Sequence, residues 1–125
     1  MNTIVVPNIF IGTDLVEVSR IRSIIDKVGQ RFKDRIYTKS EQLYCNKKAK
    51  PEIHYAGRFA AKEAIIKAIK SSGYSKPIAF NLINIESNDS TGPAVTLKFE
   101  CSGCCKVTIA HTDTHASASA LFFPQ

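Results

Sequence analysis

The chain has 125 residues, of which 44% are hydrophobic and 22% charged, so we expect one globular domain over residues 1–125 rather than a disordered chain. No apolar run approaches the roughly 20 residues that cross a membrane, and no basic residue precedes the first apolar stretch as in a secretory signal, which predicts a cytoplasmic protein. The net charge of +6 predicts an anionic partner, which composition leaves open among a nucleic acid, a phosphorylated small molecule, an acidic protein and a membrane surface.

The N-terminal part of the sequence predicts a short strand followed by an amphipathic helix. Residues 9–11 are apolar and predict a buried strand, and Gly12-Thr13-Asp14 follows at its end. Apolar residues then recur at spacings of three and four, as on one face of a helix: Val18, Ile21, Ile25, Val28 and Phe32. We expect Gly29 to end or interrupt this helix. Asp14 is thus predicted to follow a strand and open a helix, where a carboxylate can cap the helix N-terminus.

Two more helices are predicted in the middle of the chain. Thr38 and Glu41 are spaced as a capping box, which marks the start of a helix. The lysine-rich stretch 47–51 predicts a solvated loop. Residues 52–70 are rich in Ala, Glu, Lys and Ile and form the strongest helical segment, which we expect to end at residues 71–73.

The last third of the chain changes to a strand-like pattern. Residues 78–85, 94–99, 107–111 and 116–123 predict strands, and the turn-rich stretch 87–93 separates the first two. Because helices come first and strands mostly later, we predict an α+β fold, with N-terminal helices packed on a mainly antiparallel sheet.

Three places in the sequence carry residues suited to chemistry, and each also has a simpler structural explanation. Asp14 is a hard oxygen ligand suited to Mg²⁺, or else a helix cap. Glu63 and Lys67 share one face of the predicted helix with two small alanines, which suits a ligand, or else they form a surface ion pair. His111 is expected to end a strand at a sheet margin, where it can bind an anion or assist proton transfer, or else serve the structure.

The cysteines suggest a different kind of site. Cys101 and Cys104 form a Cys-x-x-Cys pair that, with His111 and His115, would supply four zinc ligands. The gap between the two pairs is shorter than in common zinc fingers, and the sequence has no second Cys-x-x-Cys pair. We therefore interpret these cysteines as reduced thiols at a turn or strand end.

Read together, these segments resemble the holo-acyl-carrier-protein synthase family, the small bacterial-type 4′-phosphopantetheinyl transferases. The resemblance rests on residues 11–21 (IGTDLVEVSRI), 31–38 (RFKDRIYT), 56–68 (AGRFAAKEAIIKA) and 107–111 (VTIAH). It covers residues 9–70 well and the C-terminal strands more loosely.

The resemblance implies an enzyme that transfers 4′-phosphopantetheine from CoA to a serine of an apo-acyl carrier protein, for fatty-acid biosynthesis. The other product is adenosine 3′,5′-bisphosphate, and Mg²⁺ is the cofactor. The attacking serine belongs to the carrier protein, so the chain needs no nucleophile of its own. The resemblance also implies an α+β fold and a homotrimer that binds CoA in clefts between its subunits.

The resemblance also assigns roles to individual residues of these segments. Asp14 and Glu63 match the Mg²⁺ ligands of the family, and Lys67 matches a lysine near the CoA phosphates, which makes these three the predicted catalytic residues. Either carboxylate could accept the serine proton. Arg58 and His111, with Lys67, match residues that line the CoA cleft. The basic positions that match the surface for the acidic carrier protein are Arg20, Arg31 and Arg35.

The sequence departs from the family pattern in four places. One is residues 92–94 (GPA), where many members have a Gly-Lys-Pro turn. Residues 69–77 (IKSSGYSKP) stand where the family commonly has a glycine-rich loop that helps to form the CoA cleft. Residues 100–106 stand where it has a helix, and Ala110 stands where it usually has Ser or Thr before the histidine. We expect these changes to affect CoA contacts and rate, and to leave the two carboxylates in place.

Two alternatives remain open at this point. A non-catalytic basic module that binds nucleic acid or an acidic protein would account for the charge, but not for Asp14 and Glu63 within two extended motifs. The sequence has no aromatic RNA-binding signature, so a nucleic acid is not the expected partner. A degenerate family member would bind CoA without transferring part of it.

Overall fold

The computed structural model describes residues 8–125, so most of the N-terminal stretch in which we looked for a secretory signal lies outside the described residues. Within residues 8–125, five strands form one sheet in the order β1-β5-β4-β3-β2, and every pair of neighbours is antiparallel. The strands are β1 (Phe10–Glu17), β2 (Ile83–Glu86), β3 (Ala94–Leu97), β4 (Gly103–His111) and β5 (His115–Pro124). The helices are α1 (Val18–Val28), α2 (Gln30–Ile36), α3 (Lys39–Asn46) and α4 (Pro51–Ser71).

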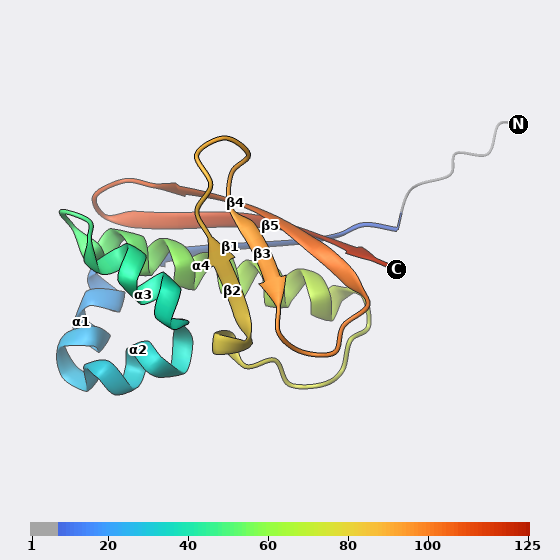
Figure 1. Cartoon of the computed structure of the whole chain (residues 1–125), viewed down its shortest axis with the longest axis horizontal. Helices are drawn as coiled ribbons and strands as arrows, with labels where there is room; N and C mark the ends of the chain where they lie inside the picture. Colours follow the sequence, from blue (N-terminus) through green and yellow to red (C-terminus); the bar gives the residue numbers. More distant parts are fainter. Residues whose placement is uncertain (1–7) are drawn as a thin grey trace, which may run out of the picture.

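The helices occupy two positions relative to the sheet. The long helix α4 packs along β1, β5 and β4, while α1, α2 and α3 gather at one end of the molecule (Figure 1). This arrangement confirms the predicted α+β fold with a mainly antiparallel sheet. None of the helices within residues 8–125 combines the length and the apolar character that a membrane crossing requires.

Strand β1 and helix α4 touch without any side chain between them at one point. A Cβ atom added to Gly12 would lie 1.9 Å from the carbonyl oxygen of Ala64 and 2.7 Å from the nitrogen of Ala68. Both alanines are fully buried. Small residues on both elements therefore bring the backbone of β1 against the backbone of α4.

The amphipathic pattern after β1 forms two helices instead of one. Val18 and Ile21 are buried, as the periodicity predicts. Gly29 adopts a φ of 71°, in the region that favours glycine, and divides α1 from α2 as expected. Val28 is 40% exposed, because it lies where the first helix ends.

Helix α3 begins with the predicted capping box and continues into a buried ion pair. The Thr38 hydroxyl accepts from the amide of Glu41, and the Glu41 carboxylate accepts from the amide of Thr38. That carboxylate lies 2.6 Å from the ammonium of Lys62 on α4, and both side chains are fully buried. Lys62 also donates to the carbonyl oxygens of Ile36 and Phe80.

Two predictions of where strands begin and end are wrong. Asp14 does not follow β1 and open a helix: it pairs with Ala118 of β5 inside the strand, and the residue before α1 is Glu17. Residues 78–85 do not form one strand, because a 3₁₀ turn at Phe80–Leu82 precedes β2. In both places, pairing with a distant strand decides where the strand lies, and local composition does not report it.

One face of the sheet is covered by α4, and the other face is exposed. One face packs against α4, with Val16, Ala118 and Phe122 among the buried residues. The other face carries Ile11 and Leu15, which are 68% and 67% exposed, and Leu121 beside Ile11 in the strand register. The exposed face is therefore partly apolar. The predicted burial of the strand over residues 9–11 is wrong, because Ile9 and Ile11 are 38% and 68% exposed.

Candidate active site

The three residues predicted to be catalytic lie together where β1 crosses α4. The ammonium of Lys67 lies 3.2 Å from a carboxylate oxygen of Asp14 and donates to the carbonyl oxygen of Thr13 at 3.0 Å. Glu63 lies one helical turn before Lys67. Its pKa is raised, chiefly because burial penalises the charged form and secondly because the Asp14 carboxylate repels it.

This geometry bears on the simpler explanations of the same residues. Asp14 lies within a strand, so it does not cap a helix. Lys67 pairs with Asp14 from another element, which is not the surface pair with Glu63 that the helical spacing allowed. The side chain of Asp14 is only 18% exposed. Asp14, whose side chain is largely shielded from solvent, therefore lies close to both Glu63 and Lys67.

The two carboxylates fit a hard divalent cation by their chemistry. Oxygen ligands suit Mg²⁺, which keeps several waters and takes further ligands from substrate phosphates. Within residues 8–125, His, Cys, Asp and Glu side chains form no group of three or more that could hold a metal ion. A pair of carboxylates agrees with Mg²⁺ better than with a metal enclosed by protein ligands alone. The pKa of Glu63 stays raised, by burial and by repulsion from Asp14, although the positive charges of Lys67 and Arg20 act in the opposite direction.

The three arginines predicted to bind a carrier protein do not form one group. Arg20 lies in the first turn of α1 and close enough to Glu63 to lower the pKa of that carboxyl. Arg31 and Arg35 lie one turn apart on α2, and both are exposed. Arg20 therefore adjoins the carboxylates, whereas the other two belong to the outer surface of the helical end.

A second polar cluster contains Arg58 and His111. Arg58 is only 4% exposed, donates to the Ser87 hydroxyl at 2.7 Å, and lies 4.0 Å from the centre of the Tyr44 ring. The ring of His54 lies between those of Tyr44 and His111, at centroid distances of 5.8 and 5.7 Å. The structure thus links the two predicted cleft residues through an aromatic pair that the sequence analysis did not identify.

The cluster around Arg58 is electropositive. The pKa of His54 is lowered, first by burial and then by the positive charges of Lys48, His111 and Arg58. Lys48 also lies 4.5 Å from the centre of the Tyr44 ring. Within the described residues, Nε of Arg58 is buried without a hydrogen-bond partner. This arrangement suits an anion. The spacing of His54 and Arg58 on one helix face is the sequence signal that could have indicated it.

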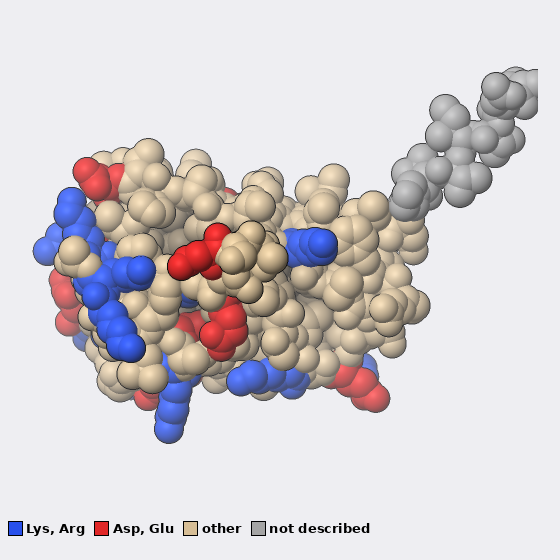
Figure 2. Space-filling model, turned by 45° about the horizontal axis from the view of Figure 1, so that its top comes forward, with Lys and Arg blue, Asp and Glu red and all other residues tan. Residues whose placement is uncertain are grey.

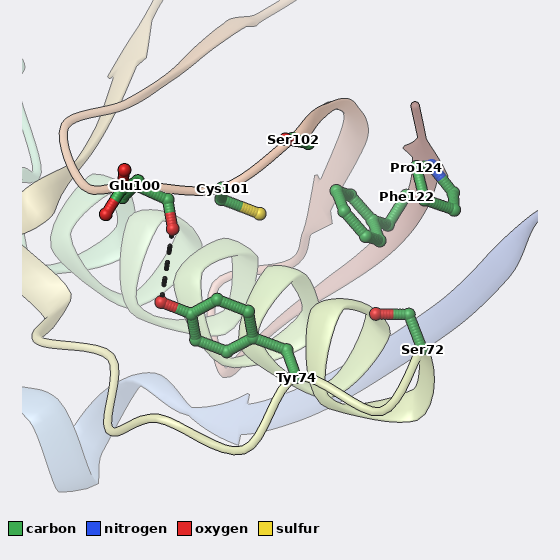
Figure 3. A pocket seen from close by; sticks show the side chains of 7 residues that line it. All are labelled: Ser72, Tyr74, Glu100, Cys101, Ser102, Phe122 and Pro124. Carbon is green, nitrogen blue, oxygen red and sulfur yellow. Dashed lines mark hydrogen bonds between the residues drawn. The ribbon is translucent and has the colours of Figure 1, made fainter.

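The two longer segments that depart from the family pattern contact each other at the far end of α4. The Tyr74 hydroxyl donates to the Glu100 carbonyl oxygen at 3.4 Å, as Figure 3 shows, and its ring packs edge-on against Phe99. Cys101 lines the small pocket of about 280 Å³ between them. The loop after α4 and the segment before β4, which both depart from the family pattern, therefore pack against each other.

The cysteines do not assemble the zinc site that their spacing allowed. All four lie within the described residues and are free thiols, and Cys45 and Cys105 are buried. Burial raises the pKa of each of these two thiols to about 12. Cys104 is exposed, because neighbouring residues of β4 point to opposite faces of the sheet. Alternation along β4 thus places Cys104 and Cys105 on opposite faces of the sheet, and no group of three or more potential metal ligands forms within residues 8–125.

Positive charge gathers at the end of the molecule that α1, α2 and α3 form. Figure 2 shows Lys and Arg side chains concentrated there on one face, while the rest of that face is mixed. The exposed basic residues of these helices include Arg20, Arg22, Lys27, Arg31 and Arg35. The net charge of +6 is therefore unevenly distributed.

Comparison with known proteins identifies the family. The profile of the 4′-phosphopantetheinyl transferase superfamily matches residues 10–120. A holo-[acyl-carrier-protein] synthase of Protochlamydia amoebophila is 40% identical over 119 residues, which cover 90% of this chain and 95% of the relative. One from Chlamydia pneumoniae is 41% identical over 118 residues, with 90% and 95% covered.

Solved structures agree with these sequence relatives. The Chronobacterium ammoniagenes ACPS–CoA complex superposes with a TM-score of 0.80 at 26% identity, covering 94% of this chain and 98% of that one. The Helicobacter pylori holo-[acyl-carrier-protein] synthase in complex with coenzyme A gives 0.76 at 29%, with 90% and 98% covered. The chain therefore belongs to the 4′-phosphopantetheinyl transferase superfamily and is an enzyme of the holo-[acyl-carrier-protein] synthase type.

Proposed function

We propose that this enzyme catalyses the Mg²⁺-dependent transfer of 4′-phosphopantetheine from CoA to a serine of an apo-acyl carrier protein, releasing adenosine 3′,5′-bisphosphate. The carrier protein would serve fatty-acid biosynthesis, and the whole chain would work as one domain in the cytoplasm. The proposal is carried by the convergence of Asp14, Glu63 and Lys67 from two elements at one point. The Chronobacterium ammoniagenes and Helicobacter pylori structures are both complexes with CoA.

Each residue at this point has a proposed part in the reaction. Asp14 and Glu63 would hold Mg²⁺, which when bound neutralises charge on the diphosphate. The Lys67 ammonium, held between Asp14 and the Thr13 carbonyl, would bind a phosphate oxygen. One of the two carboxylates would accept the serine proton. The reaction then depends on positioning and charge more than on covalent chemistry by the enzyme.

Arg58 and His111 would bind the nucleotide part of CoA. Arg58 is held by Ser87 and the Tyr44 ring, so its guanidinium is already oriented before an anion arrives. His54 supports His111 edge to face. A buried arginine with an unpartnered nitrogen suits a phosphate group, because guanidinium donors match phosphate oxygens.

The acidic carrier protein would dock on the basic helical end. Arg31 and Arg35 are exposed on α2, and Arg20 lies between this surface and the carboxylates. Opposite charge on the two partners would steer their encounter and bring the serine to the site. The surface and the site adjoin, as the transfer requires.

We further propose a homotrimer. The exposed sheet face carries Ile11, Leu15 and Leu121, and Ile11 and Leu121 line an apolar groove of about 740 Å³. A contiguous apolar patch of this kind commonly marks a protein interface. Subunits joined at these faces would bring parts of neighbouring chains to each CoA cleft.

The transfer reaction is tested by weighing the carrier protein. Purified enzyme, apo-acyl carrier protein, CoA and Mg²⁺ should produce a carrier heavier by one phosphopantetheine, and EDTA should abolish the gain. Glu63→Gln should remove most of the turnover while the fold survives. Glu52→Gln makes the same chemical change on the same helix and should retain it.

The outcomes separate the alternatives. No mass gain with several active apo-carriers would contradict the transfer. A titration would then show whether CoA still binds, as in a degenerate enzyme, or does not bind, as in a basic module. Full turnover by Glu63→Gln would contradict the Mg²⁺ assignment alone.

A further inference from the structure

The Lys67 ammonium already contacts one of the two carboxylates that are proposed to hold Mg²⁺. It lies 3.2 Å from Oδ1 of Asp14, whereas none of the salt bridges within residues 8–125 involves Glu63. The charge of Lys67 also acts on Glu63, because it lowers the pKa of that carboxyl against the effects of burial and of Asp14. A positive side chain of the enzyme itself therefore partly compensates the pair of carboxylates.

The two partners of this ion pair differ in how firmly they are held. The side chain of Asp14 is 18% exposed, and its backbone lies within β1, where Asp14 pairs with Ala118 of β5. The side chain of Lys67 is 53% exposed and reaches Asp14 from α4 on a flexible chain of four methylene groups. The carboxylate is thus fixed by the sheet, while the ammonium is free to leave it.

The carbonyl of Thr13 gives the ammonium a second point of attachment. It accepts from Lys67 at 3.0 Å, and a lysine ammonium has three donors. The contact with Asp14 can therefore be exchanged for a contact with another anion while the contact with Thr13 persists. Ion pairs with a half-exposed lysine are weak, so a phosphate oxygen can take the place of the carboxylate.

We infer that Lys67 is an internal counter-ion, which opposes the binding of a divalent cation at Asp14 until a phosphate group draws its ammonium away. The inference rests on the proposed function, which brings a divalent cation and a phosphate-bearing substrate to this point. Two cations that share one carboxylate repel each other. A unit charge a few ångströms from a divalent ion lowers the affinity for that ion by about ten-fold even at the dielectric constant of water. The free enzyme therefore binds the metal weakly, and metal and phosphate bind cooperatively.

Manganese alone tests the counter-ion. Mn²⁺ prefers the same oxygen ligands as Mg²⁺, and its EPR signal measures the ion that stays free in solution. Without any nucleotide, Lys67→Met should bind Mn²⁺ about ten-fold more tightly than the wild type, because the repelling charge is gone. Lys67→Gln also removes the charge and should show the same gain, so the test does not depend on the folding of one variant. Lys67→Arg keeps the charge and should bind Mn²⁺ as the wild type does.

Lys70→Met is the matched control for net charge. It removes the same charge from the exposed side of the last turn of α4, and it should leave the affinity for Mn²⁺ unchanged. An equal gain in Lys70→Met would overturn the inference, because net charge alone would then account for the effect. Unchanged affinity in both Lys67→Met and Lys67→Gln would also overturn it.

The same titration with CoA present tests the exchange. Saturating CoA should raise the affinity for Mn²⁺ by a larger factor in the wild type than in Lys67→Met, in which no ammonium has to leave Asp14. Equal factors would overturn the exchange. Absence of Mn²⁺ binding in every variant would overturn the inference together with the Mg²⁺ assignment. Binding is measured without a carrier protein, so failure of the transfer reaction remains a separate result.

Discussion

Gly12 shows how one missing side chain supports both the packing and the site. The backbones of β1 and α4 meet there, and the two carboxylates come from these same elements, at Asp14 and Glu63. A methyl group at position 12 has no space, because its neighbours are backbone atoms that cannot rotate away. Separation of β1 from α4 would therefore also separate the carboxylates.

Gly12→Ala should lower the free energy of unfolding by about 3 kcal/mol, the upper part of the usual range for overpacking. Urea denaturation measures the loss. Gly57→Ala is the matched control, since its new Cβ would meet only the end of the Ile109 side chain, at 3.1 Å. The gain in helix propensity of about 1 kcal/mol should offset that contact. Similar losses in both variants would contradict the argument.

Glu63 should make the metal-free protein less stable as the pH rises. Its pKa is raised in the folded state, so between the unfolded and folded pKa values the native protein binds more protons and unfolding becomes easier with increasing pH. Glu63→Gln cannot ionise. In EDTA it should equal the wild type in acid and become more stable toward neutral pH, by less than about 1 kcal/mol because solvent screens the site. A stability difference that does not change with pH would contradict the prediction.

At the scale of elements, the buried pair of Lys62 and Glu41 joins the helices to the sheet. Lys62 lies on α4, and its hydrogen bonds reach the end of α2 and the 3₁₀ turn at Phe80–Leu82. Glu41 begins α3 and accepts from the amide of Ile85 on β2. Every element of the helical end except α1 is therefore held by one ion pair.

Lys62→Met should cost about 3–5 kcal/mol, because it leaves the Glu41 carboxylate buried without its partner. Lys70→Met makes the same change at an exposed position of the same helix and should stay within about 0.5 kcal/mol. The two variants can be compared by thermal and urea unfolding. A small loss for Lys62→Met would mean that the surrounding structure relaxes to hydrate the carboxylate.

The elements that could be predicted are those whose signals are local. The helical spacing after residue 17, the capping box at Thr38 and the Ala-rich helix over residues 52–70 match the helices observed. The strand register was not accessible in this way. Gly12-Thr13-Asp14 has the composition of a turn, yet β5 pairs with it and extends the strand to Glu17.

The same contrast between local signals and contacts of distant segments holds for the candidate site. The sequence motifs named Asp14, Glu63, Lys67, Arg58 and His111, and the structure groups the first three at one point. Tyr44 and His54 were missed because their contacts join α3, α4 and β4, which are distant in sequence. A motif records which residues are present, whereas their neighbours across elements depend on the fold.

At the scale of the whole molecule, an apolar sheet face lies opposite the face that α4 covers. If this face joins subunits, Leu15→Arg should shift the protein to a monomer in sedimentation analysis, because it would bury a charge in the interface. Leu43→Arg is the control: Leu43 is 62% exposed on α3, and Leu15 is 67% exposed. Trimers that persist in Leu15→Arg would contradict the proposed interface.

The two buried thiols make the protein its own reporter of local opening. Cys45 lies on α3 in the helical end and Cys105 on β4 in the sheet, and both are buried. A short pulse of an alkylating reagent can mark each of them only while its surroundings are open. Peptide masses after the pulse would then show whether the helical end and the sheet open together or separately.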